Sequence, residues 1–564
     1  MDYKSIIANL IEIEGISSAE IAALITPPKD SKMGDFCLPC FRFSKALRKS
    51  PIAIAEELAA SITLPDCFEK AEAVAGYLNF TLDKKAYNKR IIEKAVAEGK
   101  AYGDQNVGEG KNVCIDYSSV NVAKPLHIGH LSSTAIGAAL YRIYKKLGYN
   151  AIGINHLGDW GTQFGKLIVA YKLWGNDEDI EKRGVTALVE IYVRYHKEAE
   201  EKPEMDDEAR AWFKKIEDFD PEATRLFNWF KEITLKEVVK IYDRLGIKFD
   251  YYTGESFYND KMQPVLDLLE KKGLLVESNG AKVVDLSAYN MPPCLLVRSD
   301  GATLYATRDL AAAYYRKATF DFYKCLYVVA YQQNLHFKQW FKVVELAGES
   351  WAKDLVHVNF GMVSLPDGAI KTRAGNYILL EDVLNKSVEK ALQIITEKSP
   401  DLENKEEVAE QVGIGAVLFS VLYNGRIKDI VFSYDRVLNF DGETGPYVQY
   451  THARCNSVLK KASEYDDGGE VDYSGISDEE SSEVVKLIAS FPEAVKAAAE
   501  KYEPCFVARH LVSLAQSYNR FYLANRIANA EPKIRNARVL LTTAVKNVLE
   551  SGLALLGIAA PEKM

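Results

Sequence analysis

The sequence has 564 residues, of which 48% are hydrophobic and 26% are charged, and its formal net charge at pH 7 is −9. This length exceeds what one hydrophobic core supports and favours three or four domains of roughly 100–200 residues each. Membrane spans and a secretory signal are not expected, because charged residues interrupt the apolar runs before the roughly 18 residues that a membrane helix needs. We therefore expect a multidomain soluble enzyme of the cytoplasm.

The cysteines and the charge distribution indicate which kinds of binding site the protein can have. Eight cysteines are scattered along the sequence, and the one close pair, Cys37 and Cys40, lacks the second pair of Cys or His ligands that a zinc site requires. We expect reduced thiols and no metal centre. Because phosphates attract Lys and Arg, a chain with this net charge binds nucleic acid only through local basic clusters. Acidic stretches at 198–220 and 464–483 are typical of solvated helices or loops.

Residues 1–84 are predicted to form an N-terminal α+β domain. Helical periodicity is found at 6–10, 41–47 and 52–62, and the segment 76–82 is strand-like. Ser50 and Pro51 are typical of the cap and first position of a helix. A basic cluster in this domain consists of Lys32, Arg42, Lys45, Arg48 and Lys49. On charge alone, this cluster is equally well explained as a solubilising surface or as an RNA contact.

The remaining sequence divides into an α/β part and a helical part. After a helical linker at 85–110, strands rich in Val, Ile and Tyr alternate with helices from 111 to 385, with a mostly helical acidic insertion at about 176–250. This alternation predicts a Rossmann-like, doubly wound parallel sheet, which binds nucleotides where its strands end. Two further helical parts are expected, a connector at 386–442 and a C-terminal all-α domain at 443–564.

The most informative motif is His127-Ile128-Gly129-His130, between a predicted strand at 112–117 and a predicted helix at 131–144. A helix start offers backbone N–H groups and a positive dipole end to a phosphate. Gly129 leaves room for a base or ribose, and both histidines can donate hydrogen bonds to an α-phosphate as charge accumulates on it. The motif therefore predicts attack on an α-phosphate with release of pyrophosphate.

With Lys124 just upstream, the motif resembles the class I aminoacyl-tRNA synthetases, and within them the arginyl enzymes. The resemblance extends from about residue 35 to residue 564. Other segments that resemble this family are 155–165, 305–312, 327–336, 359–363 and 370–375. The last two look like the second class I signature loop in the degenerate form typical of arginyl enzymes. Departures from the family pattern occur at Val120, Ser132, Ala138 and Asn334, none of which is expected to touch the reacting atoms.

The resemblance implies that ATP and L-arginine form arginyl-adenylate, whose arginyl group then passes to the terminal ribose of tRNA(Arg). The expected ATP-binding residues are His127, Gly129, His130, Met362 and Val363. Mg²⁺ is expected on the ATP phosphates, because it prefers water and phosphate oxygens to a full protein cage. The resemblance also implies a catalytic phosphate clamp of Lys124, Lys371 and Arg373 together with the two histidines. Lys124 is alternatively an ordinary exposed loop lysine.

Recognition of arginine requires partners for a planar guanidinium, which pairs best with carboxylates and planar acceptors. The positions that match the family's arginine-binding residues are Asp116, Asn121, Tyr305, Asp309 and Gln333. Asp116 and Asp309 are expected to share the α-amino and guanidinium groups, in an order that the sequence leaves open. Asp309 is alternatively the N-cap of a helix at 310–315.

The two outer domains resemble those that bind tRNA in arginyl enzymes, at the elbow and at the anticodon. Aromatic, Arg and Asn side chains suit unpaired bases. The candidate tRNA-binding residues are Arg42, Arg48, Tyr447, Arg454, Asn519 and Tyr522. The expected partners are tRNA(Arg), L-arginine and ATP, without a membrane, and we expect a monomer.

Two other classes of protein remain as alternatives. An adenylyltransferase of the same superfamily would leave the N-terminal domain and the helical tail without a purpose. An RNA-binding relative without catalysis would have lost the two histidines, which are present here.

Overall fold

The computed structural model describes residues 3–28, 30, 33–122, 124–366, 378–464 and 469–564. The chain forms two compact units. Unit 1 consists of Met1–Gly99, Val458–Ala489 and Gln516–Asn547. Unit 2 consists of Lys100–Ser457, Ser490–Ala515 and Val548–Met564. Each unit therefore combines an early part of the sequence with parts of the C-terminal helices.

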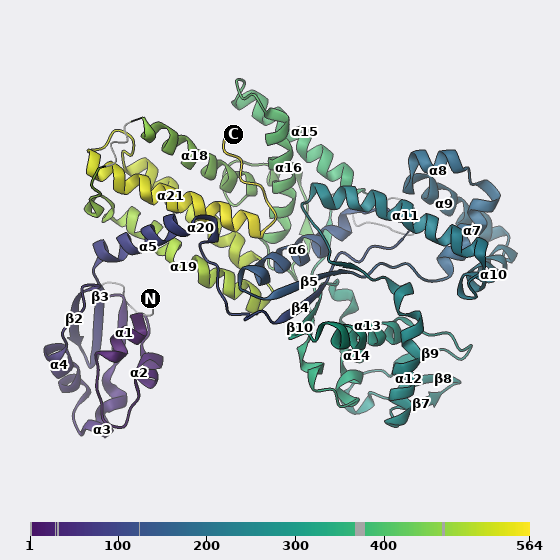
Figure 1. Cartoon of the computed structure of the whole chain (residues 1–564), viewed down its shortest axis with the longest axis horizontal. Coiled ribbons are helices and arrows are strands. Elements are labelled where there is room, and N and C mark those ends of the chain that lie inside the picture. The colour runs from purple at the N-terminus through teal and green to yellow at the C-terminus, as the bar shows by residue number, and fades with distance from the viewer. Residues whose placement is uncertain (1–2, 29, 31–32, 123, 367–377, 465–468) are drawn as a thin grey trace. The chain divides into compact units, whose positions relative to one another are not determined.

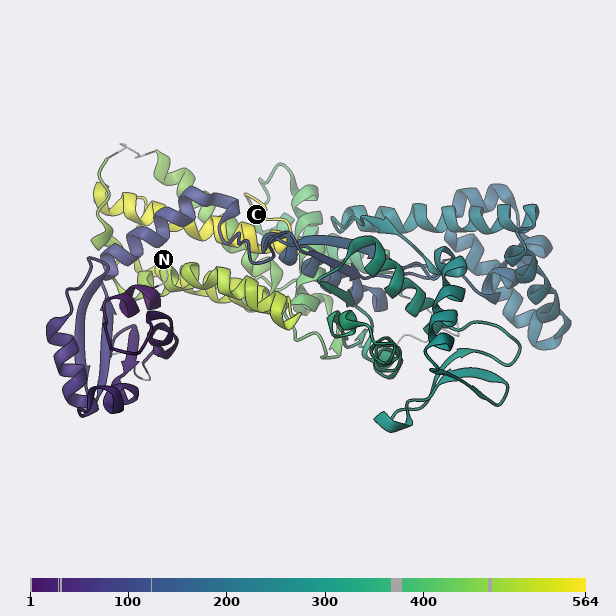
Figure 2. The ribbon, with the colours of Figure 1, turned by 60° about the horizontal axis from the view of Figure 1, so that its bottom comes forward.

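The N-terminal part of unit 1 is an antiparallel sheet with helices on both faces, as Figures 1 and 2 show. Its strands have the order β1-β3-β2, with β1 at Phe36–Pro39, β2 at Phe68–Val74 and β3 at Tyr77–Leu82. The helices are α1 (Tyr3–Asn9), α2 (Ser18–Leu24), α3 (Ser44–Leu47) and α4 (Pro51–Ser61). Ser50 Oγ accepts a hydrogen bond from Ala53 N at 3.2 Å, and Pro51 begins α4. The predicted α+β domain and its helix cap are confirmed.

The helical part of unit 1 packs around α5 (Lys84–Glu98). Asn88 Nδ2 donates to the carbonyl of Ile476 at 2.9 Å, and Asn547 Nδ2 donates to the carbonyl of Ala95 at 3.1 Å. These bonds tie both ends of α5 to the C-terminal helices. The predicted linker thus begins as a long, well-packed helix.

Unit 2 is built on a five-stranded parallel sheet with the order β11-β10-β4-β5-β6. The strands are β4 (Asn112–Asp116), β5 (Asn150–Asn155), β6 (Tyr251–Tyr252), β10 (Lys324–Tyr327) and β11 (Leu355–His357). The middle strands are apolar and buried, as expected of a parallel sheet covered on both faces. Because all strands run in the same direction, their carboxyl ends meet at one edge. The predicted Rossmann-like catalytic fold is confirmed.

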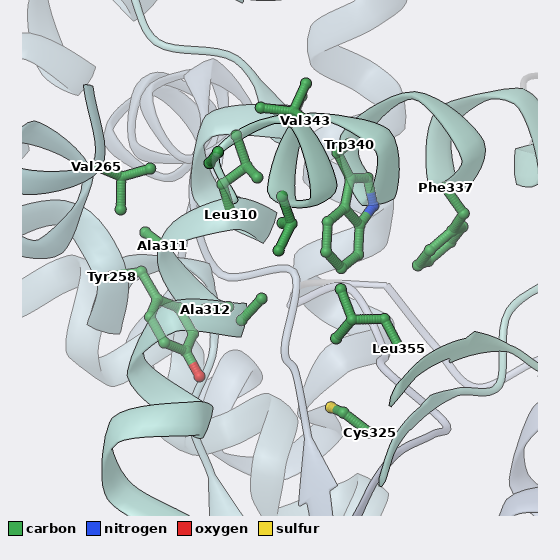
Figure 3. Packing of buried hydrophobic residues seen from close by; sticks show 14 of the residues in the cluster. Tyr258, Val265, Leu310, Ala311, Ala312, Cys325, Phe337, Trp340, Val343 and Leu355 are labelled. Atoms are coloured by element: carbon green, nitrogen blue, oxygen red, sulfur yellow. The ribbon is translucent and has the colours of Figure 1, made fainter. Parts of the chain in front are cut away.

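Helices α6 (Leu131–Lys146), α13 (Tyr305–Phe320) and α14 (Asn334–Leu346) cover this sheet. Figure 3 shows Leu310 of α13 and Trp340 of α14 packed together near Cys325 and Leu355 of the strands. A small antiparallel sheet and a helix precede α13, namely α12 (Met262–Lys271), β7 (Leu275–Ser278), β8 (Ala281–Val284) and β9 (Cys294–Val297). This packing fixes α13 against the sheet, which matters for the site below.

The expected helical insertion lies between β5 and β6, where Figures 1 and 2 show a group of helices. Its elements are α7 (Thr162–Trp174), α8 (Asp177–Arg183), α9 (Val185–Glu201), α10 (Glu204–Glu217) and α11 (Pro221–Arg244). These helices bury an apolar cluster of their own, which includes Phe164, Trp212 and Phe230. The insertion therefore has its own core.

The last part of the chain is helical, as predicted. Its helices are α15 (Leu380–Lys398), α16 (Lys405–Leu422), α17 (Tyr434–Val437), α18 (Gly445–Ser463), α19 (Glu479–Lys501), α20 (Cys505–Ala524) and α21 (Pro532–Leu555). Within α21, Gly552 lies directly against Leu511 of α20, where a Cβ atom would clash. In the described part of the chain, no helix is long and apolar enough to cross a membrane.

Candidate active site

The two histidines of the His-x-Gly-His motif lie between β4 and α6, as the sequence predicts. His127 caps a short 3-10 helix, η4 (Ile128–His130), that leads directly into α6. His127 Nδ1 accepts a hydrogen bond from Gly129 N at 3.1 Å, and His130 Nδ1 accepts one from His127 N at 3.2 Å. These bonds assign the proton of each neutral ring to Nε2. Each imidazole is thereby oriented as a donor through Nε2.

Both imidazoles are held in the neutral form at physiological pH. Burial, assisted by the charge of Lys124, lowers the pKa of His127 to about 4. Burial and the neighbouring His127 ring, whose centroid is 4.0 Å away, lower the pKa of His130 to about 3. The pair therefore offers two hydrogen-bond donors without a fixed positive charge. The positive charge for a phosphate has to come from other residues.

Lys124 is an exposed residue of the β4–α6 loop, and its charge acts on both histidines. Lys371 and Arg373, the other predicted clamp residues, lie outside the described residues. The described chain next to them approaches the motif: Leu379 forms an antiparallel bridge with His127, and Ile128 N donates to Ile378 O at 3.0 Å. The described chain therefore resumes, at Ile378 and Leu379, beside the first histidine.

Met362 and Val363 lie on the other side of that segment. Val363 belongs to β12 (Val363–Ser364), which pairs in parallel with β13 (Ile430–Val431) and lies close to η4. Met362 N donates to Asp429 Oδ1 at 2.7 Å. The structure thus brings the candidate ATP-binding residues near the histidines from two distant parts of the sequence.

Asp116 is the last residue of β4 and is only 5% exposed. Its carboxylate accepts hydrogen bonds from Arg316 Nη2 at 2.8 Å and from Ser119 Oγ at 2.7 Å. Asn121, further along the same loop, lies directly against Gly158, where a Cβ atom would clash with its side-chain oxygen. The backbone of this loop also pairs with Gly158. The side chain of Asn121, a predicted arginine-binding residue, is thus held in place by its close contact with Gly158.

Tyr305 and Asp309 lie one turn apart at the start of α13, and Tyr305 is 64% exposed. Asp309 Oδ2 contacts His336 Nε2 of α14 at 2.6 Å. The N-cap of α13 is Leu304, because the helix begins at Tyr305 rather than at residue 310. The alternative interpretation of Asp309 as a helix cap is therefore wrong. Asp309 is a helical residue whose carboxylate is positioned by a histidine.

Gln333, the remaining predicted arginine-binding residue, ends a short 3-10 helix, η7 (Tyr331–Gln333), just before α14. It is exposed and lies one turn before His336. Asn334, one of the departures from the family pattern, accepts a hydrogen bond from Asn359 Nδ2 at 3.0 Å. Three other departures, Val120, Ser132 and Ala138, are buried in the protein interior. None of the four shows a contact that disturbs the predicted site.

A third carboxylate, Glu255, was missed by the sequence analysis. It begins a 3-10 helix, η5 (Glu255–Lys261), shortly after β6, and its backbone N donates to Leu157 O at 2.9 Å. The pKa of Glu255 is raised to about 7, mainly by burial; the charge of Arg308 opposes this rise, and the charges of Asp309 and Asp159 add to it. The only sequence signal was its place after a strand of the parallel sheet. Glu255 and Asp309 are close enough for the charge of Asp309 to act on Glu255.

Asp159, within the 155–165 segment, has a structural role. Its fully buried carboxylate accepts hydrogen bonds from Lys231 Nζ at 2.5 Å, Ser256 N at 2.8 Å and Ser256 Oγ at 2.7 Å. Gly254 lies against this carboxylate so closely that a Cβ atom would clash. Asp159 therefore fixes the loop that carries Glu255.

The candidate tRNA-binding residues fall in both units. Arg42, Arg48, Asn519 and Tyr522 belong to unit 1, and Tyr447 and Arg454 belong to unit 2. In unit 2, the Arg454 guanidinium lies 4.9 Å from the centre of the Tyr450 ring. Tyr450 was not among the predicted residues, although its ring is partly exposed.

An exposed aromatic pair in unit 1 was also missed. The rings of Phe41 and Tyr77 are 5.1 Å apart, and these residues are 50% and 40% exposed. Phe41 precedes Arg42, and Gly76, with φ of +82°, allows the turn before Tyr77 to pack against the Phe41 ring. Exposed aromatic rings beside a basic cluster suit stacked bases. Phe41 and Tyr77 are far apart in the sequence, so the sequence alone did not indicate that their rings form a pair.

Comparison with known protein families finds matches in three parts of the chain. Residues 91–434 match the family described as tRNA synthetases class I (R), catalytic domain. Residues 448–564 match the DALR anticodon binding domain, and residues 2–82 match the arginyl tRNA synthetase N terminal domain. The catalytic match includes all the site residues of unit 2 between β4 and β12.

Individual relatives match over the whole chain. The chain is 54% identical to the arginine–tRNA ligase of Alkaliphilus metalliredigens and 52% identical to that of Halothermothrix orenii, with 100% of both chains covered in each case. Among solved structures, the arginyl-tRNA synthetase of Thermus thermophilus is similar with a TM-score of 0.79 and 27% identity, and 96% of each chain is covered.

Proposed function

The chain belongs to the class I arginyl-tRNA synthetases, and we propose how the residues described above perform the reaction of this family. The reaction ligates L-arginine to tRNA through an arginyl-adenylate intermediate. ATP is consumed, and AMP and pyrophosphate are released. The observation that supports the assignment of the site most strongly is the position of His127 and His130 on the connection that leads from β4, which ends at Asp116, into α6.

In the first step, an oxygen of the arginine carboxylate attacks the α-phosphorus of ATP, and the bond from this phosphorus to the pyrophosphate oxygen breaks. His127 and His130 donate hydrogen bonds from Nε2 to the phosphate oxygens as negative charge develops there. Gly129, Met362 and Val363 line the nucleotide site. Because the histidines are neutral, Lys124, Lys371 and Arg373 supply the positive charge that balances the leaving pyrophosphate.

Mg²⁺ would be bound mainly by the ATP phosphates. The described residues contain no group of three or more His, Cys, Asp or Glu side chains that fits a metal ion. Mg²⁺ readily keeps water and phosphate oxygens as ligands and needs few protein ligands, so a site whose side chains hold the phosphates is compatible with it. When bound, the ion would screen the charge of the phosphates.

Arginine is proposed to lie between β4 and α13. Asp116 ends the strand whose loop carries both histidines, so it is assigned to the α-amino group, which is close to the reacting carboxylate. Asp309 and Glu255 are assigned to the guanidinium group, because two carboxylates can accept its several N–H donors. Tyr305, Asn121 and Gln333 complete the pocket.

The tRNA is proposed to bind through both outer domains. The N-terminal domain (1–84) would contact the elbow through Phe41, Arg42, Arg48 and Tyr77. The C-terminal domain (443–564) would read the anticodon loop through Tyr447, Arg454, Asn519 and Tyr522, and the segments 85–110 and 386–442 join these domains to the catalytic domain (111–385). The matches at 2–82 and 448–564 support this assignment. We further propose a cytoplasmic monomer with tRNA(Arg) as its partner.

Aminoacylation of unfractionated tRNA with radiolabelled amino acids tests the proposal. We expect arginine alone to be attached, and only to tRNA(Arg). Sedimentation of the protein with and without tRNA tests the proposed monomer. Attachment of another amino acid with equal efficiency would refute the assignment of the pocket.

A further inference from the structure

Arg316, which no part of the proposed function uses, forms a buried ion pair with Asp116. Its side chain is 1% exposed, and Nη2 donates to Asp116 Oδ2 at 2.8 Å. The guanidinium also lies 5.3 Å from the centre of the Tyr327 ring, while Nε has no hydrogen-bond partner in the described part of the chain. Such a pair rarely stabilises a fold more than apolar residues of the same size would, because removing two charges from water is costly. Its presence therefore calls for a functional reason.

The position of Arg316 in α13 supplies that reason. Asp309 and Arg316 are seven residues apart in the same helix, which corresponds to two turns and roughly 10 Å along the axis. Residues at this spacing lie on nearly the same side of a helix. One rigid helix therefore carries the Asp309 carboxylate at its start and, two turns later, the cation that holds Asp116 at the end of β4.

The geometry points to Arg316 as a positioning residue that orients the Asp116 carboxylate toward the arginine α-amino group and that fixes, through α13, the distance of this carboxylate from Asp309. This inference rests on the proposed assignment of Asp116 and Asp309 to the two ends of the substrate. Arg316 itself touches no substrate atom. It acts through Asp116 and through the spacing between β4 and α13.

In the described part of the chain, Arg316 is the cationic residue that contacts the Asp116 carboxylate. The polar groups nearby come from four elements: Cys114 on β4, His156 after β5, Tyr258 on η5, and Cys325 and Tyr327 on β10. Burial lowers the pKa of His156, so this ring is neutral at physiological pH. Among the described residues, no other lysine or arginine is hydrogen-bonded to the Asp116 carboxylate.

Steady-state kinetics of Arg316→Met, Arg316→Lys and Asp116→Asn test this role, measured as tRNA-dependent ATP–pyrophosphate exchange at one fixed pH. Without Arg316, the buried carboxylate loses the donor that orients it, so the arginine α-amino group is bound less well. We expect Arg316→Met to raise the KM for arginine more than 10-fold, with the KM for ATP within twofold of wild type.

Two variants separate positioning from structural support. Arg316→Lys keeps the positive charge, so its KM for arginine should lie between those of Arg316→Met and wild type, because one ammonium group orients the carboxylate less well than a guanidinium does. Tyr314→Phe is the matched control: it removes a polar contact of the same helix, the 3.3 Å bond to Glu349, without touching β4. We expect this variant to keep the wild-type KM for arginine.

The outcomes distinguish this inference from the proposed function. If Asp116→Asn leaves the KM for arginine unchanged, the assignment of Asp116 fails, and this inference fails with it. If Asp116→Asn raises the KM for arginine while Arg316→Met lowers only kcat or the melting temperature and leaves this KM unchanged, this inference alone is overturned. Failure of both Arg316 variants to fold would assign the pair a purely structural role and would equally overturn it.

Discussion

His127 and Leu379 form an antiparallel backbone bridge, so the chain that leaves the segment 367–377 pairs directly with the first histidine of the active site. Leu380 N extends this pairing by donating to Leu126 O at 2.9 Å. Leu380 is also the first residue of α15, which packs along α16. The chain from Ile378 to Leu380 is thus tied both to the histidine motif and to the following helices.

His127 has two separable roles, as a helix cap through Nδ1 and as a phosphate donor through Nε2. Removing one preorganised donor to a developing anion typically costs about 10²–10³-fold in rate, and we expect this loss in the exchange rate of His127→Ala. His127→Asn keeps an acceptor for Gly129 N but lacks the distal donor. We expect it to lose as much activity as His127→Ala while it keeps the wild-type melting temperature. Equal activity of His127→Asn and wild type would remove Nε2 from the mechanism.

Arginine binding should depend on pH through Glu255, whose pKa is about 7 in the protein. A bound guanidinium favours the ionised carboxylate, so protonation of Glu255 opposes binding. The affinity should therefore rise as the pH increases from 6 to 8 and then become constant. Calorimetric titration with arginine measures this. Glu255→Gln should bind more weakly and show no such rise, and an unchanged pH profile in this variant would exclude Glu255 from the pocket.

Asp309→Asn isolates the charge of Asp309, because the amide oxygen can still accept a hydrogen bond from His336 Nε2. We expect arginine affinity to fall at least 10-fold with little change in melting temperature. Lysine should remain a very poor substrate, since its ammonium leaves buried acceptors unpaired at a cost of roughly 1–3 kcal/mol. Calorimetry with both amino acids checks this. Normal arginine binding by Asp309→Asn would place the guanidinium elsewhere.

The aromatic pair of unit 1 should contribute to tRNA binding. Base stacking on an aromatic side chain is worth about 1–3 kcal/mol per base, so we expect Phe41→Ala and Tyr77→Ala each to raise the KM for tRNA about 5- to 100-fold. The KM values for arginine and ATP should not change. Val74→Ala, an exposed aliphatic change on the neighbouring strand β2, is the control. Wild-type KM for tRNA in both aromatic variants would show that this surface does not contact the elbow.

The local parts of the site were predictable from the sequence. An apolar run followed by the His-x-Gly-His motif and a helical segment identified β4, η4 and α6, because each of these depends on neighbouring residues. Ser50 and Pro51 likewise identified the start of α4. The parallel sheet followed from the alternation of strands and helices. Such signals are carried by short segments and do not require knowledge of the tertiary fold.

The parts that depend on tertiary packing were not predictable. Arg316 is an arginine in a helical segment, and nothing in its sequence neighbours distinguishes it from a surface residue. Glu255 acquires its raised pKa only from burial beside residues that are distant in sequence. The start of α13 was placed too late, because Tyr305 to Arg308 lack a cap signal and Leu304 makes no side-chain cap hydrogen bond.

The way in which the C-terminal helices divide between the two units was also not predictable from the sequence. Parts of α19, α20 and α21 belong to the compact unit of the catalytic sheet. Within that unit, Tyr144 OH donates to Ala499 O at 3.1 Å, and Gln105 Nε2 donates to Pro492 O at 2.8 Å. Truncation after residue 440 would remove these partners. The truncated protein is therefore expected to lose stability in unit 2 as well as tRNA binding.

We propose that the histidine motif, the clamp residues and the arginine-binding residues form one site, and the resemblance to arginyl enzymes implies that this site becomes active when tRNA is bound. A 100-fold stimulation would require tRNA to favour the active arrangement by about 2.7 kcal/mol. The most direct measurement is ATP–pyrophosphate exchange in rigorously tRNA-free protein with each amino acid in turn, before and after addition of tRNA(Arg). We expect exchange with arginine alone, nearly absent without tRNA and restored by it. Full exchange without tRNA, or equal exchange with another amino acid, would contradict the claim.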